Sequence, residues 1–151
     1  MDLDSALLWA HAAATTSLAG LVWVMQVVVY PSFRLVGPTA AWPQVHAHHT
    51  RSTAAVVLLP WSVQGLSLAA LLLRRPDGVA LPLLLVTGAL AATTVVVTAG
   101  SSVPLHGRLS QGYDDAVARR LVTTNWLRTA AWTAGAGCSL LMVGLARTPV
   151  S

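Results

Sequence analysis

The sequence has very little charge, and two of the common charged residues are missing altogether. Only 9% of its 151 residues are charged, and it contains neither lysine nor glutamate. A water-soluble domain carries roughly 25% charged residues, so this chain has too little polar surface to cover a soluble globule. The 55% share of apolar residues therefore predicts an integral membrane protein.

Cysteine and the common catalytic motifs are also scarce. The single cysteine, Cys138, excludes an intramolecular disulfide and a CxxC redox pair. Without glutamate, a di-iron carboxylate site is excluded, because it takes several such ligands. The sequence has no GxSxG, P-loop, GxGxxG or HExxH motif, so hydrolase and nucleotide-dependent mechanisms have no support. The arginines are spread over short connecting segments, and we expect no nucleic-acid partner.

Four apolar segments are long enough to cross a bilayer, which takes about 20 apolar residues each. They cover residues 5–30, 52–73, 79–103 and 129–146. Lipid offers no partner to backbone N–H and C=O groups, so these segments are expected to be helices. Pro31 and Pro104 are expected to end the first and third helices, because proline lacks the N–H that continues a helix. The predicted fold is all-α, a four-transmembrane-helix bundle made of one domain, residues 1–151.

Two long connections join the predicted helices. Residues 31–50 join the first two helices and residues 104–124 join the last two, on the same side of the membrane. Residues 114–122 begin with two aspartates and end near two arginines, as the helix dipole favours, with apolar residues four apart. The pattern predicts a short amphipathic interfacial helix between the third and fourth spans.

The arginines also predict the orientation. Six of the nine lie on the side of the long connections, so the positive-inside rule places these connections in the cytoplasm. The arginine, alanine and valine usage is typical of a high-GC bacterium. We therefore expect a multi-pass protein of the bacterial cytoplasmic (inner) membrane.

Polar residues gather at the same end as the long connections. A polar group in or near a membrane span is a functional candidate by default. The candidate site residues are Gln26, Tyr30, His46, His49, Arg51, His106, Asn125, Trp126 and Arg128. His11 is the exception, because it lies near the opposite end of the predicted bundle.

Three of the histidines are candidate metal ligands. His46 and His49 have i,i+3 spacing and share a helix face, and His106 follows the third helix. Imidazole is a ligand for copper, iron and zinc, so the three predict a copper, iron or haem centre. Two alternatives stay open: imidazoles lying among lipid headgroups, and a proton-relay or substrate role.

The other candidates predict a substrate pocket. Arg51 and Arg128 offer a planar fork for a carboxylate, a phenolate or a lipid phosphate, although each can also snorkel to the interface. Gln26, four residues before Tyr30, lines a cavity or pairs with another helix. Asn125 alternatively caps the fourth helix. The tryptophan at 126 walls a pocket for a flat ligand or belongs to an interfacial belt.

Taken together, these motifs resemble those of a group of small, largely uncharacterised bacterial four-helix membrane proteins. The resemblance extends from about residue 20 to residue 132 and rests on Gln26–Tyr30-Pro31, His46-x-x-His49-Thr50-Arg51, Pro104-Leu105-His106 and Asn125-Trp126-Leu127-Arg128-Thr129. More remotely, the four spans and the start of the fourth helix are similar to the anthrone-oxygenase-like family. That similarity implies oxidation of polycyclic aromatic substrates.

Two classes of function follow. The first is a membrane oxidoreductase or oxygenase acting on an apolar or aromatic substrate in a histidine-rich pocket. The second is a non-enzymatic membrane protein, such as a lipid-binding module, a small transporter subunit working as a homo-oligomer, or an assembly partner. Convergence of the polar side chains discriminates between them, because an active site needs them within reach of one another.

Overall fold

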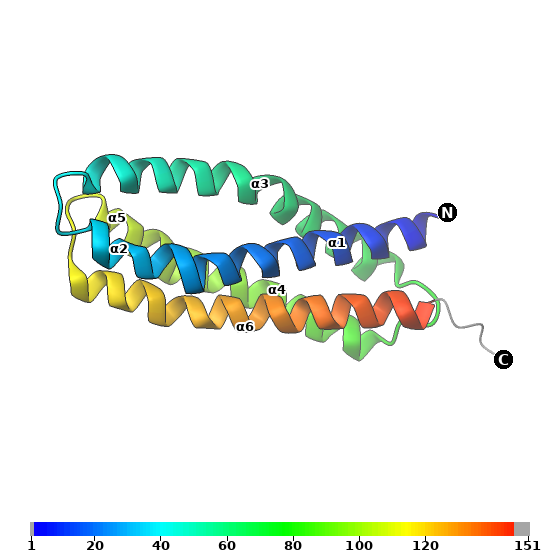
Figure 1. Ribbon diagram of the computed structural model, residues 1–151. Coiled ribbons are helices and arrows are strands. Elements are labelled where there is room, and N and C mark those ends of the chain that lie inside the picture. Colours follow the sequence, from blue (N-terminus) through cyan, green and yellow to red (C-terminus); the bar gives the residue numbers. More distant parts are fainter. Residues whose placement is uncertain (1, 147–151) are drawn as a thin grey trace.

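A computed structural model describes residues 2–146, and all its regular secondary structure is helical. Four long helical rods run side by side (Figure 1). They consist of α1 (Leu3–Val24), the π-helical turn η1 (Met25–Val29) and α2 (Tyr30–Val36); α3 (Trp42–Arg74); α4 (Leu81–Val97), the π-helical turn η2 (Thr98–Ser102) and α5 (Val103–Leu109); and α6 (Asp115–Ala146). The predicted all-α class with four long apolar helices is therefore confirmed.

Each rod is long and apolar enough to cross a membrane. The rods contain 34, 33, 29 and 32 residues in chain order. At 1.5 Å per residue they are roughly 43–51 Å long, which exceeds the ~30 Å of a hydrocarbon core. All four rods therefore extend beyond the segments that hydropathy alone selects.

Two of the predicted helix ends are wrong, because the first and third rods continue through Pro31 and Pro104. In each rod a π-helical turn lies just before the proline. The N–H of Tyr30 donates to the carbonyl of Met25, and the N–H of Val103 donates to that of Thr98. This wider turn gives room for a ring that would otherwise clash with the carbonyl four residues earlier.

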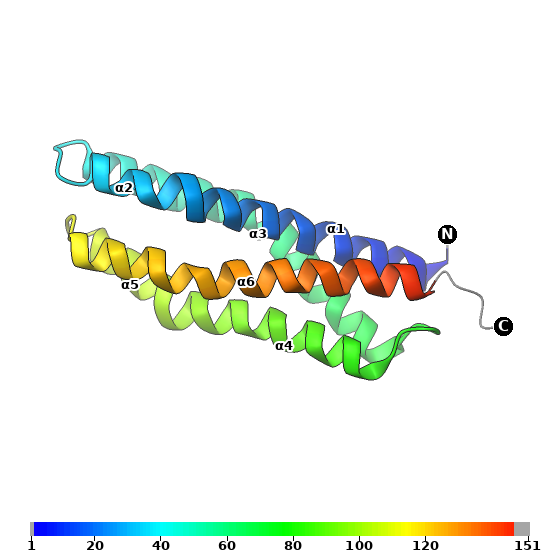
Figure 2. The same cartoon turned by 60° about the horizontal axis from the view of Figure 1, so that its bottom comes forward.

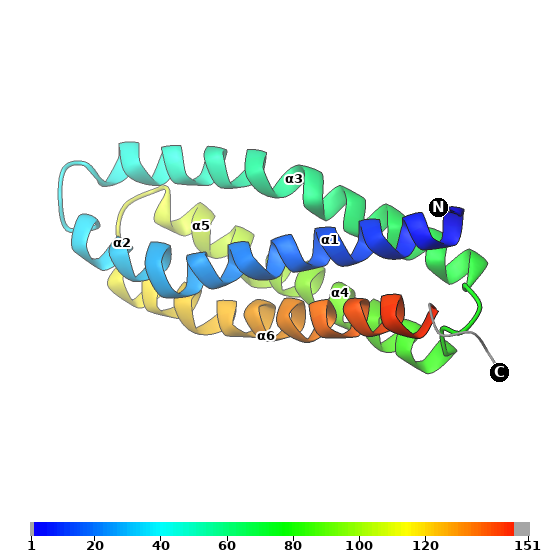
Figure 3. The same ribbon diagram turned by 45° about the vertical axis from the view of Figure 1, so that its right-hand side comes forward.

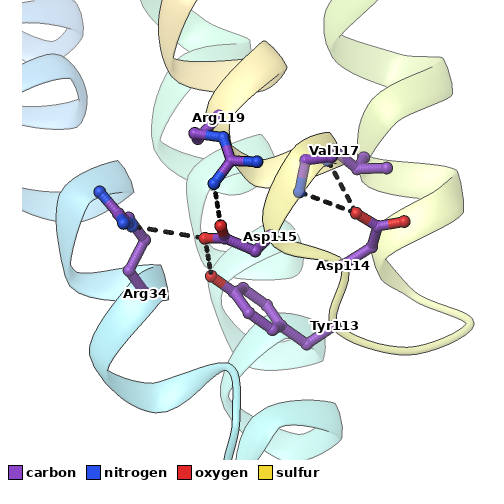
Figure 4. A network of polar contacts seen from close by, with 7 residues as sticks. Arg34, Tyr113, Asp114, Asp115, Val117 and Arg119 are labelled. Carbon is purple, nitrogen blue, oxygen red and sulfur yellow. Dashed lines mark hydrogen bonds and ion pairs between the residues drawn. The ribbon is translucent and has the colours of Figure 1, made fainter.

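The second and fourth helices also begin earlier than expected. The second begins at Trp42 instead of residue 52, with proline in its first turn, a position that needs no N–H donor. The predicted separate interfacial helix is not seen, because its residues form the first turns of the continuous α6. Asp114 caps α6 by accepting from the N–H groups of Ala116 and Val117, at 2.8 and 3.0 Å (Figure 4).

The rods pack in the order α3, α1, α6, α4. The helix α6 packs against both α1 and α4, whereas α3 packs mainly on α1 and only slightly on α4 (Figure 2). The helix α3 contains Pro60 and bends near its middle (Figures 1 and 3). An open hollow lies between the first half of α3 and α5.

The carboxylate of Asp115 links the first rod to the start of α6. It lies at the end of the bundle where short connections follow α2 and α5. Asp115 accepts from the hydroxyl of Tyr113 at 3.1 Å and pairs with Arg34 at 3.4 Å and with Arg119 (Figure 4). Burial and this contact with Asp115 raise the pKa of Tyr113. The ion pairs are well exposed, so they position the two segments and contribute little stability.

Gly37 is the residue that lets Tyr113 pack against the end of α2. A Cβ on Gly37 would overlap the ring of Tyr113, which also meets the edge of Trp42 at 5.1 Å. The φ angle of Gly37 is −53°, an ordinary helical value. Glycine is therefore needed at this position for space alone.

We predict that Gly37→Ala lowers the free energy of unfolding by about 1–3 kcal/mol, the usual cost of overpacking. The matched control is Gly107→Ala in α5, where no atom lies near the added Cβ. That change is expected to stabilise by about 0.5–1 kcal/mol through helix propensity. Unfolding midpoints in mild detergent measure both, and equal shifts would contradict the packing described here.

Candidate functional site

Three imidazoles from two rods meet at the end of the bundle that holds the two connections. His46 and His49 lie on α3, and His106 lies on α5. The Nε2 atom of His46 is 3.1 Å from the Nδ1 atom of His106, within hydrogen-bond distance. The ring of His49 is 5.5 Å from that of His106 and 6.5 Å from that of His46. The structure thus brings together the three histidines selected by spacing, and we call them the imidazole group.

Aromatic side chains surround the imidazole group. The ring of Phe33 meets that of His49 edge-on at 4.9 Å, and Trp42 lies 4.9 Å from His46. Tyr30 is 5.9–6.0 Å from His106 and His49. His46 itself is only 2% exposed. These contacts oppose the headgroup interpretation for His46, because its neighbours are protein rings.

His48 behaves differently from its neighbours. Its side chain is exposed, and its Nε2 atom lies 3.4 Å from the hydroxyl of Ser52 on the same helix. It therefore takes no part in the imidazole group and provides a matched control for the other two histidines of α3.

The metal prediction finds no geometric support. Within residues 2–146, no group of three or more His, Cys, Asp or Glu side chains is arranged to hold a metal ion. One nitrogen each of His46 and His106 is already engaged in their mutual contact. The donor set of neutral imidazoles suits copper or iron chemically, so a copper, iron or haem centre stays a prediction.

A partly buried guanidinium lies beside the imidazole group. Arg128 of α6 donates to the hydroxyl of Ser102 at 3.0 Å and lies 5.0 Å from the ring centroid of Trp132. It also interacts with the hydroxyl of Tyr30. Its contacts point inward, which opposes the snorkelling interpretation.

Both neutral partners of Arg128 depend on the π-helical turns. Ser102 is the last residue of η2, and Tyr30 directly follows η1. Sequence reasoning missed Ser102, because a serine among small residues carries no signal of its own. The sequence did offer one signal, a proline two residues after each π-helical turn. Such a proline within a helix can mark a π-helical turn, and these turns are frequent at functional sites.

Arg128 has no acidic partner. The five acidic residues of the chain stand at positions 2, 4, 77, 114 and 115, close to the ends of the helices. Arg128 lies 13 residues beyond the start of α6, roughly 20 Å along the helix. Burying a cation without a counter-charge is costly. A cost of this kind is typical of residues retained for function.

An amide pair lies one turn from Arg128. The amide nitrogen of Asn125 donates to Gln26 at 2.8 Å, and Gln26 donates to the carbonyl of Val122 at 3.2 Å. Both amides are almost fully buried. Asn125 lies inside the continuous α6, so its helix-capping interpretation is wrong. The pairing of Gln26 with another helix is observed.

The last two candidates lie at the surface. Arg51 is exposed on α3 and borders an open hollow of about 440 Å³ between α3 and α5. His46 and His106 also line this hollow. Trp126 is 48% exposed and meets the edge of Trp23 at 5.6 Å, so it does not wall the site. Its position fits the interfacial belt instead.

A second polar network extends from this region toward the far end of the bundle. The indole of Trp132 donates to Gln64 at 3.2 Å, and Gln64 donates to Thr15 at 3.1 Å. His11 joins the network through a 3.1 Å contact between its Nδ1 atom and the hydroxyl of Ser67. Trp132 therefore connects Arg128 to the buried His11.

Comparisons with protein-family models, with curated proteins and with solved structures find no match to this chain. Buried neutral imidazoles can accept a proton, and a guanidinium in an apolar interior can stabilise an oxyanion.

We predict that Gln26 and Asn125 are strongly coupled. Gln26→Leu and Asn125→Leu should each cost about 1–3 kcal/mol of unfolding free energy, because each leaves a buried amide unsatisfied. The double variant should cost clearly less than the sum. Denaturant unfolding in detergent measures the cycle, with the exposed Gln44→Leu on α3 as control. Additive effects would refute the coupling.

Proposed function

We propose that this protein is a multi-pass protein of the bacterial cytoplasmic membrane with an oxidoreductase site at the end where the imidazole group lies. Its substrate is a small apolar or aromatic molecule, and dioxygen is the oxidant. The length and apolar character of the four rods support the membrane location. The arginine distribution supports a cytoplasmic position for the connections.

Convergence is the observation that carries the proposal. Imidazoles that only contact headgroups would splay outward, away from one another. Instead, His46 and His106 are in direct contact, His49 lies beside them, and Arg128 interacts with Tyr30, whose ring is 5.9 Å from that of His106. Proton abstraction requires a base, and stabilisation of the resulting anion requires a cation or hydrogen-bond donors. The imidazole group and Arg128 provide both.

Each residue type then has a role. A neutral imidazole of the His46 and His106 pair takes a proton from a weakly acidic C–H or O–H group of the substrate. Arg128 stabilises the resulting oxyanion, and its effect is large because the surrounding bundle is apolar. Both roles are independent of a metal on the three imidazoles.

The overall reaction follows the resemblance to the anthrone-oxygenase-like family. A substrate methylene and dioxygen give a carbonyl and one water molecule. The carbon loses four electrons and two hydrogens, one oxygen atom enters the carbonyl, and the other leaves as water. No further reductant is needed.

A lipid-binding role is the second candidate, and one observation favours it. Arg51 is exposed at the rim of the open hollow between α3 and α5. If that end of the bundle lies at headgroup level, Arg51 is placed to hold a lipid phosphate. In this case the imidazole group would line a lipid site without chemistry.

We predict that the purified protein consumes dioxygen with polycyclic aromatic substrates that contain an activated methylene. His46→Ala and His106→Ala should lower the rate at least about 100-fold, the lower end of general-base effects. His48→Ala should stay within about twofold, since His48 lies outside the imidazole group. An oxygen electrode gives the rate, and mass spectrometry gives the product.

The same samples decide the metal question. Copper or iron present in the starting protein and lost in His46→Ala, His49→Ala and His106→Ala would assign the metal to the imidazole group. Equal activity in these three variants and in His48→Ala would refute the oxidoreductase proposal. Co-purified phospholipid that is lost in Arg51→Ala would then favour the lipid-binding role.

A further inference from the structure

The open hollow between the first half of α3 and α5 reaches the imidazole group. Its volume is about 440 Å³, within the range of roughly 300–1,000 Å³ that small-molecule sites usually have. His46 lines it from α3 and His106 lines it from α5. Gly107 keeps it open, because no atom lies within 4 Å of a Cβ added there. The hollow is therefore large enough for a ligand that touches two of the imidazoles.

Both imidazoles keep a nitrogen for such a ligand. The contact between the two rings engages the Nε2 atom of His46 and the Nδ1 atom of His106. Within residues 2–146 this leaves the other nitrogen of each ring for a further partner. A ring nitrogen of a neutral histidine either donates or accepts a hydrogen bond. The imidazoles thus offer the ligand polar contacts without a negative charge.

The charge at the rim of the hollow is positive. Arg51 lines the hollow, whereas none of its lining residues is an aspartate or a glutamate. In the part of the chain that the structure describes, Arg51 also takes part in no ion pair. Charge-assisted hydrogen bonds to an oxyanion are the strongest that a guanidinium makes. The hollow is therefore complementary to a ligand with a negatively charged oxygen.

Arg51 lies close to the level at which lipid headgroups meet the hydrocarbon. The 33 residues of α3 are roughly 50 Å long, about 20 Å more than the hydrocarbon core. Arg51 follows the first residue of α3, Trp42, by roughly 14 Å along the helix. With the excess length shared equally by the two ends, Arg51 is within about one helical turn of that boundary. The apolar side chain of Val103, which also lines the hollow, is 61% exposed.

We propose that the hollow binds a single-chain amphiphile with one anionic head, a long-chain carboxylate, taken up sideways from the bilayer. The head pairs with Arg51 and lies beside His46 and His106. The chain packs over Val103 and Gly107 and continues into the lipid. One cation and a space of about 440 Å³ suit one charged head and one chain. This inference rests on the membrane location in the proposed function and is independent of the oxidation reaction.

Photo-cross-linking of the full chain in phosphatidylcholine nanodiscs tests the inference without any turnover. The probes are a long-chain carboxylate that carries a diazirine and the alcohol of the same chain, and peptide mass spectrometry locates the adducts. We expect the carboxylate to label residues 42–51 and 103–110 about threefold more than the alcohol, as an ion pair at an exposed site allows. An unlabelled carboxylate should compete for these adducts, and the unlabelled alcohol should compete less.

Variants then separate the space from the charge. Gly107→Leu should lower the labelling about fivefold or more, because the leucine fills the hollow. Its matched control, Gly20→Leu at an exposed and open position of α1, should stay within about twofold. Arg51→Met should remove the preference for the carboxylate. Arg120→Met, which removes the same charge from an exposed position of α6, should keep that preference. The competition in the wild-type protein keeps the test valid if a variant does not fold.

Three results would overturn the inference. Equal labelling by the carboxylate and the alcohol would show that the hollow does not recognise the anion. Undiminished labelling in Gly107→Leu would show that the adducts come from the surrounding bilayer. Stronger labelling by a phosphatidylglycerol with the same diazirine chain would assign the hollow to a phospholipid. Carboxylate labelling without oxygen uptake would refute the oxidoreductase proposal alone, and oxygen uptake without a carboxylate preference would refute only this inference.

Discussion

A guanidinium with no carboxylate partner, set inside an apolar helical bundle, is the constraint on which the other features of this protein depend. Arg128 is surrounded by neutral groups only: the hydroxyls of Ser102 and Tyr30 and the ring of Trp132. These contacts offset part of the desolvation free energy of the guanidinium without neutralising its charge. A site of this kind is poised for an anion, or for a substrate that becomes one.

The backbone is shaped to meet this constraint. Each π-helical turn adds one residue to a turn of the first or third rod, which rotates the following side chains by about 100° relative to a regular α-helix. Tyr30 and Ser102 owe their inward positions to these turns, and Pro31 and Pro104 favour the wider geometry at both places. The proline positions thus connect the sequence directly to the site.

Much of the fold could be predicted from the sequence, because lipid leaves long apolar segments little choice but to form helices. The meeting of His46, His49 and His106 also followed from spacing and topology. The continuation of helices through proline did not, because the rule that treats proline as a stop ignores the π-helical turn. Ser102 was missed, since a serine among small residues of a membrane helix gives no sign of a functional role.

The unfolding temperature of Arg128→Met, measured in mild detergent without ligand, tests the central claim most directly. If the guanidinium is retained for binding at a cost in stability, the variant should unfold at a higher temperature than the wild-type protein, because a buried uncompensated charge has been removed. The exposed Arg51→Met should leave the midpoint unchanged. A lower midpoint for Arg128→Met would show that the guanidinium is a structural element and would contradict the account.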